Sequence, residues 1–191
     1  MSFLKNEFYT KLQISPIIAA VNNLKKLDNA IQSPCEIIFL LKGNILNLDK
    51  IVHKVKESGK SIYIHVDLME GFGKDEYALR YTKEKINPHG IISTKASIIK
   101  VAKDIELFAI QRLFILDNLS LNSGIATVKS IKPDAVEILP GVMNKITEKI
   151  RKEINVPVIT GGLISDKEDV IGSLKAGAIA ISTSKEEIWY M

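Results

Sequence analysis

Short apolar runs alternate with longer amphipathic segments along the whole chain, and no low-complexity stretch or Pro/Gly/Ser-rich linker interrupts them. The apolar runs are rich in Ile, Val and Phe, and several are apolar at both parities, as is typical of parallel strands covered on both faces. The pattern predicts strands at residues 16–21, 36–41, 61–66, 90–93, 112–116, 135–139, 158–160 and 178–182.

Helical periodicity fills the intervals between these runs. The predicted helices are residues 48–58, 75–86, 95–106, 121–131, 142–154 and 166–176, with a short link around residues 24–31. Eight βα units in so short a chain leave about 22 residues per unit, near the lower limit for a (β/α)8 barrel. We therefore predict an α/β fold of one domain, a compact (β/α)8 or TIM barrel over residues 1–191, with residues 1–15 as an N-terminal arm. An open doubly wound sheet is the alternative, although no Gly-x-Gly-x-x-Gly turn follows an early strand.

Composition narrows the class of protein. Hydrophobic residues make up 46% of the chain and charged residues 25%, values that exclude a disordered polypeptide. The single cysteine, Cys35, excludes an intramolecular disulfide and a thiolate metal cluster, which favours a reducing compartment. Every apolar run is far shorter than the roughly 20 residues that span a bilayer, and no signal-peptide pattern opens the chain. We expect a cytoplasmic protein with no membrane partner, and its net charge of +4 permits a polyanionic one.

Polar residues stand at the carboxyl ends of the predicted strands, where barrels bind their ligands. His65 and Asp67 share one face of the third strand because side chains alternate along a strand. Glu137 lies between Val and Ile in the sixth strand, where a carboxylate is costly to bury unless a cation, a proton or a ligand satisfies it. Lys95, after the fourth strand, and Lys42 are the candidate cations.

Several of these residues also have a purely structural interpretation. His65 by itself is compatible with an interior histidine satisfied by a neighbour. Ser93, Thr94 and Asp117 also end strands, and they are suited to cap the helices that follow. At this level both interpretations stay open.

The last two units carry a more specific pattern. Two glycines end the seventh strand, and a run of hydroxyls ends the eighth just before a short final helix. Barrels commonly bind phosphate at this position, because glycine lets an anion approach backbone N–H groups and hydroxyls complete the contacts. A tight turn that needs positive φ is the alternative for the glycines. The residues predicted to bind phosphate are Gly161, Gly162, Ser182, Thr183 and Ser184.

Several blocks, in this order, resemble one family over nearly the full length of the chain. They are Pro16-Ile-Ile-Ala-Ala-Val21, His65-Val-Asp67-Leu68 with Glu70-Gly71 and Lys74-Asp75-Glu76, Gly90-Ile-Ile-Ser-Thr-Lys95, Ala109-Ile-Gln-Arg112, Val136-Glu-Ile-Leu-Pro-Gly141, Gly161-Gly162, and Ser182-Thr-Ser184 with Trp189. Together these blocks resemble the glycerol-3-phosphate-responsive antiterminators, also called glycerol uptake operon antiterminator regulatory proteins.

The resemblance implies a non-catalytic barrel that binds glycerol 3-phosphate. When loaded, such a protein is expected to bind the leader mRNA of glycerol-utilisation genes and prevent early transcription termination. The glycine and hydroxyl residues above would then hold the phosphate, and His65, Asp67, Lys95 and Glu137 would line the pocket near the glycerol hydroxyls. Neither a cofactor nor a metal nor a catalytic residue is implied. Gln111 and Arg112, which begin the fifth predicted strand, are interpreted as structural or surface groups.

The residues themselves give little direct support for RNA binding. The chain has no RNP-type or KH motif and only 6% aromatic residues, which limits stacking platforms for bases. The nearest approach to a basic stripe is Lys145, Lys149, Arg151 and Lys152 in one predicted helix. Whether the chain associates with itself is left open.

The competing hypothesis is a TIM-barrel enzyme that acts on a small phosphorylated substrate. An isomerase or aldolase would use Lys95 and Glu137. A phosphodiesterase would need a His-Arg pair after the first strand, where the sequence has Ala20-Val21-Asn22. A third hypothesis, an interaction scaffold, would bind no phosphate. We expect a regulator and not an enzyme.

Overall fold

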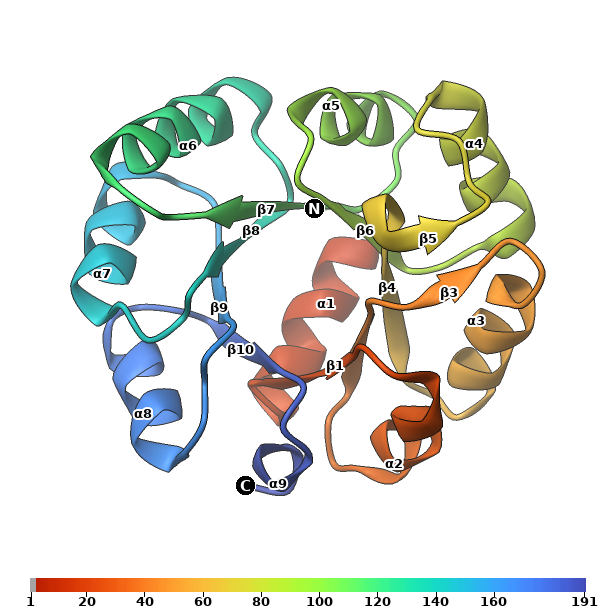
Figure 1. Cartoon of the computed structure of the whole chain (residues 1–191), viewed down its shortest axis with the longest axis horizontal. Helices are drawn as coiled ribbons and strands as arrows, with labels where there is room; N and C mark the ends of the chain where they lie inside the picture. Colours follow the sequence, from red (N-terminus) through yellow and green to blue (C-terminus); the bar gives the residue numbers. More distant parts are fainter. Residues whose placement is uncertain (1–2) are drawn as a thin grey trace.

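The protein forms a closed barrel of eight parallel strands with helices around it, as shown by a computed structural model that describes residues 3–191 (Figure 1). The barrel strands are β1 (Ile17–Val21), β2 (Ile37–Leu40), β4 (Ser61–His65), β6 (Gly90–Ser93), β7 (Ala109–Phe114), β8 (Ala135–Leu139), β9 (Val158–Gly161) and β10 (Ala180–Thr183). The last strand pairs back with the first, with Ile181 beside Ile17, and this pairing closes the ring. The predicted (β/α)8 barrel is confirmed, and the open doubly wound sheet is excluded.

The helices pack around the outside of the ring. They are α2 (Leu27–Gln32), α3 (Leu48–Glu57), α4 (Glu76–Tyr81), α5 (Ala96–Asp104), α6 (Asn118–Ile131), α7 (Asn144–Glu153), α8 (Lys167–Lys175) and the short α9 (Glu186–Trp189). A 3-10 turn, Leu24–Lys26, precedes α2, and a π-helical turn, Thr82–Ile86, extends α4. No helix within residues 3–191 is both long and apolar enough to cross a bilayer.

Strand residues of alternate parity fill two different apolar layers. Inward-facing side chains such as Ile18, Phe39 and Ile159 form the barrel interior. Their neighbours, such as Ile38 and Ile64, face outward and pack against the surrounding helices. This double burial explains why the strands are apolar at both parities.

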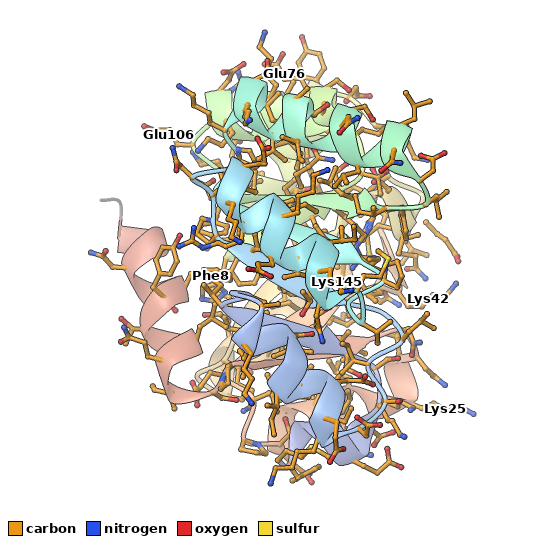
Figure 2. All side chains as sticks on the ribbon, turned by 90° about the vertical axis from the view of Figure 1, so that its left-hand side faces the viewer. Phe8, Lys25, Lys42, Glu76, Glu106 and Lys145 are labelled. Atoms are coloured by element: carbon orange, nitrogen blue, oxygen red, sulfur yellow. The ribbon has the colours of Figure 1, made fainter. Side chains whose placement is uncertain are left out.

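The predicted N-terminal arm is largely a helix, α1 (Phe3–Ile14), which lies across the end of the barrel where the strands begin (Figure 1). Met1 and Ser2 of the predicted arm lie outside the described residues. Phe8 points from α1 toward the barrel (Figure 2), with its ring 5.3 Å from that of Tyr63 and 4.9 Å from that of Phe108. Glu7 accepts a hydrogen bond of 2.9 Å from the Ser61 hydroxyl. An aromatic cluster therefore closes this end of the barrel.

At the opposite end, two loops form a small sheet that the sequence did not predict. Its strands, β3 (Gly43–Asn44) and β5 (Met69–Glu70), follow β2 and β4 in the chain. Lys42, at the start of this loop, lies at the end of the barrel away from α1 (Figure 2). Its Nζ atom is 2.5 Å from Oε1 of Glu70, which ties the two loops together on the surface.

The fifth barrel strand begins earlier than predicted, at Ala109 and not at Arg112. Leu116, which was placed in the strand, is 84% exposed in the loop that follows. The start of the strand was predicted at two polar residues, Gln111 and Arg112, but both are buried within the strand. The Gln111 amide nitrogen donates to the carbonyl oxygens of Thr94 and Arg112, so burial leaves that group satisfied. Arg112 is consequently an interior residue.

Candidate functional site

A pocket of about 400 Å³ opens at the carboxyl ends of the strands, the end of the barrel opposite α1. Residues of β7, β8 and β10 form its floor, and the segments after β9 and β10 form its rim. The lining consists of Ala20, Leu41, Arg112, Glu137, Leu139, Gly162, Leu163, Ile164, Ser165, Ser182, Thr183, Ser184 and Lys185.

A buried ion pair forms the floor of this pocket. Arg112 and Glu137 are register partners on β7 and β8, and Arg112 Nε lies 2.6 Å from Glu137 Oε2. The Ser182 hydroxyl, on β10, donates to the other carboxylate oxygen, Oε1. Glu137 is fully buried and Arg112 is 7% exposed. The cation that satisfies Glu137 is therefore Arg112, and the expectation that Lys95 or Lys42 would do so is wrong.

The two glycines at the end of β9 do different things. A Cβ atom on Gly161 would lie 2.5 Å from Ser182 Oγ and 2.9 Å from Glu137 Oε1, so the hydrogen bond between these side chains passes through the space that glycine leaves. Gly162 has φ of +73° and lines the pocket itself. Gly161 thus shapes the floor from behind, and Gly162 presents its backbone at the rim.

Hydroxyl groups and one lysine define the rim after β10. The Thr183 hydroxyl accepts a hydrogen bond of 3.2 Å from the Lys185 backbone N–H. The indole N–H of Trp189 donates to the Thr183 carbonyl oxygen at 2.8 Å, which fixes the strand end from below. Lys185 reaches across the rim and donates to the Ser165 carbonyl oxygen at 2.8 Å. Lys185 was not among the predicted site residues, although its position directly after the hydroxyl run was a usable signal.

His65 lies near this floor as a neutral imidazole. Its Nδ1 atom is buried, 3.9 Å from Asp67 Oδ2, and has no hydrogen-bond partner within residues 3–191. Burial, and then the positive charge of Arg112, lower the pKa of His65 to about 4, against the opposing effect of Asp67. The side chain is therefore uncharged at neutral pH.

Asp67 ties together the segments that follow β4 and β6. Its carboxylate accepts hydrogen bonds from the Ser93 hydroxyl at 2.9 Å, the Thr94 backbone N–H at 2.7 Å and the Thr94 hydroxyl at 2.9 Å. Partial burial acts to raise the pKa of Asp67, but these hydrogen bonds outweigh it and hold the pKa below its usual range. Its oxygens are thus engaged within the protein.

The structural interpretation applies to Asp117. Its side chain accepts a hydrogen bond of 2.7 Å from the Ser120 backbone N–H, and the Asp117 backbone N–H in turn donates to the Ser120 hydroxyl oxygen at 3.0 Å. These two hydrogen bonds form a capping box at the N-terminus of α6. Asp117 does not line the pocket.

The predicted site residues therefore divide into two groups. Glu137, Gly162, Ser182, Thr183 and Ser184 line the same pocket, joined by Arg112 and Lys185, which the sequence interpretation did not place there. The remaining residues, Gly161, His65, Asp67 and Lys95, are not part of its lining.

Lys95 is exposed at the start of α5 and does not line the pocket, and Glu137 pairs with Arg112. The partner of the buried carboxylate is therefore an arginine and not the lysine that an aldolase or isomerase mechanism required. Residues 3–191 also contain no group of three or more His, Cys, Asp or Glu side chains arranged to bind a metal ion.

Comparison with known proteins decides the family. A family model described as the glycerol-3-phosphate responsive antiterminator matches residues 17–189, from β1 to α9. The chain belongs to this family. The match covers every strand of the barrel. Membership of this family implies a regulator and not an enzyme.

Similar proteins agree with this assignment. The chain is 42% identical over 178 residues to the uncharacterized protein YgcP of Escherichia coli K12, covering 93% of each. The crystal structure of the glycerol uptake operon antiterminator regulatory protein of Listeria monocytogenes matches with 34% identity and a TM-score of 0.88, over 92% of this chain and 95% of that one. A glycerol uptake operon antiterminator-related protein of Thermotoga maritima matches with 33% identity and a TM-score of 0.84, over 93% and 99%. An aldolase, QR15, shares the fold alone at 12% identity and a TM-score of 0.70.

Proposed function

We propose that this antiterminator-family protein binds glycerol 3-phosphate in the pocket at the open end of the barrel. The loaded form then associates in the cytoplasm with the leader mRNA of glycerol-utilisation genes and prevents early termination. The observation that carries the proposal is the division of the pocket into a rim suited to an anion and a floor suited to hydroxyl groups.

The rim has the groups that hold a phosphate. Gly162 offers backbone without a Cβ atom, Ser184 adds a hydroxyl and Lys185 adds a positive charge beside them. Thr183 and Ser182, predicted from the sequence, hold this segment in place through the hydrogen bonds described above. Gly161 supports it by leaving the space that the floor requires.

The floor has the groups that recognise hydroxyls. Arg112 can donate hydrogen bonds, Ser182 can accept them because its own proton goes to Glu137, and neutral His65 lies close by. Asp67 contributes by fixing the segments after β4 and β6, and Lys95 stands exposed just beyond them.

Ligand binding would couple these segments. A molecule held at both ends joins the loops after β9 and β10 to the strands of the floor, and the conformation that binds it better gains population. An RNA-competent surface would then include the basic stripe on α7, where Lys145, Lys149 and Arg151 are exposed (Figure 2 marks Lys145). Lys152 on the same helix already pairs with Glu148 at 2.7 Å.

Calorimetric titration tests the proposal directly. Glycerol 3-phosphate is compared with glycerol and with inorganic phosphate, and NMR of the same mixtures monitors turnover. Saturable binding that needs both halves of the ligand, without any new product, is expected. Absence of binding, or conversion of the ligand, would overturn the proposal. A gel-shift experiment with leader RNA, with and without ligand and at two salt concentrations, then tests the RNA step.

A further inference from the structure

The floor of the pocket holds two opposite charges that balance each other. The guanidinium charge of Arg112 is matched by the carboxylate of Glu137 at 2.6 Å. His65 is neutral at this floor because burial lowers its pKa to about 4. The remaining positive charge of the lining, Lys185, stands at the rim and not on the floor.

Glu137 is poorly placed to bind a ligand hydroxyl itself. One of its oxygens accepts from Arg112 Nε, and the other accepts from Ser182. The two terminal guanidinium nitrogens of Arg112, in contrast, have no hydrogen-bond partner within residues 3–191, and Arg112 lines the pocket. The ligand therefore meets the donors of Arg112, while Glu137 sets the charge behind them.

This difference matters because an arginine without a partner is the preferred protein group for a carboxylate. A buried guanidinium with no counter-charge would attract a ligand whose second end is anionic. With Glu137 in place, such a ligand would bring an uncompensated negative charge next to a floor whose charged side chains are buried.

We propose that Glu137 is a specificity-determining residue, which neutralises Arg112 so that the pocket accepts a three-carbon phosphate with an uncharged hydroxyl end and rejects the same skeleton ending in a carboxylate. The inference rests on the proposed function, since it assumes that the phosphate end occupies the rim. Recognition of the glycerol hydroxyls needs only the donors of Arg112, whereas discrimination against a carboxylate also explains why Glu137 is paired with it.

Calorimetry with two ligands tests the inference. Glycerol 3-phosphate and 3-phosphoglycerate share their skeleton and phosphate and differ at one terminal carbon, which is a hydroxymethyl group in the first and a carboxylate in the second. The wild-type protein is expected to prefer glycerol 3-phosphate by about tenfold or more, because one uncompensated charge at close range shifts a binding equilibrium by at least that factor.

Two variants separate charge from shape. Glu137→Gln keeps the size of the side chain and leaves Arg112 unbalanced, so the ratio of the two affinities is expected to move toward 3-phosphoglycerate by about tenfold or more. The double variant Arg112→Gln with Glu137→Gln removes both charges and is expected to restore the preference for the uncharged end, with weaker binding of both ligands. Circular dichroism and thermal melting confirm that each variant is folded.

The outcomes are distinguishable. If the wild-type protein binds neither ligand, the proposed function fails. If it binds glycerol 3-phosphate but binds 3-phosphoglycerate equally well or better, or if Glu137→Gln leaves the affinity ratio unchanged, the inference fails and the proposed function stands. Should Glu137→Gln not fold, the wild-type ratio and the double variant, which buries no unpaired charge, decide the question.

Discussion

The two ends of the barrel are built from the same strands, yet they have opposite chemistry. Along five strands, an apolar inward-facing residue near α1 is followed two positions later by a polar residue or glycine near the pocket. These pairs are Tyr63 and His65, Ile110 and Arg112, Ala135 and Glu137, Ile159 and Gly161, and Ala180 and Ser182. Two residues along a strand, one full period of side-chain alternation, therefore separate the aromatic end of the barrel from the hydrogen-bonded pocket.

This contrast assigns different tasks to the two ends. The aromatic contacts of Phe8 with Tyr63 and Phe108 stabilise the fold by packing α1 against the barrel. The buried ion pair at the other end contributes little net stability by itself, because desolvation opposes the attraction of its charges. Its presence there is better explained by binding, as is usual for the carboxyl end of barrel strands.

The largest expected effect comes from a matched pair of glycine substitutions, one at each end. Gly162→Asp places a carboxylate on the rim, and we expect glycerol 3-phosphate affinity to fall at least about 100-fold because two anions repel in a confined site. Gly59→Asp is the control. Its φ of +79° is close to the +73° of Gly162, its Cβ would meet nothing within 4 Å, and it lies at the α1 end, where its carbonyl accepts from Lys11.

Calorimetry and thermal melting on both variants measure the difference. Gly59→Asp should bind glycerol 3-phosphate like the wild-type protein, because its backbone strain is similar but remote from the pocket. Normal affinity in Gly162→Asp would show that the rim is not the phosphate site.

Loss of Glu137 should damage stability and binding together. Glu137→Ala leaves the Arg112 guanidinium buried without its partner, which lowers the free energy of unfolding by about 3–5 kcal/mol. Denaturant titration measures this change, and calorimetry should show weaker glycerol 3-phosphate binding by the fraction that folds, because Arg112 and Ser182 lose the partner that holds them. A variant with wild-type stability would contradict the importance of the ion pair.

Loss of Phe8 should damage stability alone. Phe8→Ala opens a cavity between α1 and the barrel and lowers the free energy of unfolding by about 3–4 kcal/mol, since the ring is fully buried. The affinity of the folded protein for glycerol 3-phosphate should stay within about twofold of wild type, because additive behaviour is usual for distant sites. A large loss of affinity would mean that the two ends are coupled.

The same contrast explains what the sequence could and could not predict. The closed barrel follows from apolar runs of both parities, and the rim residues follow from the glycine and hydroxyl runs at 161–162 and 182–184. Arg112 was missed because a buried arginine is recognisable only from its partner, and Glu137 lies on the neighbouring strand, 25 positions away in the chain. The closing role of α1 was missed because it depends on Phe8 and Leu12 meeting the barrel interior.

A smaller effect is expected from acid. Because the pKa of His65 falls from an ordinary value near 6.5 to about 4 on folding, the unfolded chain binds this proton more readily than the native protein. The contribution of His65 is complete above about pH 6.5, and it declines by about 3 kcal/mol as the pH falls to 4. Denaturant titrations across this range should show a shallower decline in His65→Asn.

Burial lowers the pKa of His89, near α1, as well. His89 therefore also makes stability fall as the pH falls, and part of the decline in stability should remain in His65→Asn. An unchanged slope in His65→Asn would show that this imidazole is not held neutral.

The smallest expected effect comes from the rim lysine. Lys185→Met removes one exposed charge beside the proposed phosphate site and should weaken glycerol 3-phosphate binding about fivefold, because exposed charge pairs are worth up to about 1 kcal/mol. The salt dependence of the affinity should decrease as well. Lys100→Met, an exposed lysine of α5 outside the pocket, should change neither.

Hydrogen exchange with and without glycerol 3-phosphate tests the central claim most directly, because it compares both ends of the barrel in one experiment. We predict slower amide exchange at residues 161–165 and 182–185 when ligand is bound, with exchange in α1 unchanged. Protection confined to α1, or exchange unaffected by saturating ligand at the open end, would contradict the assignment of the pocket as the binding site.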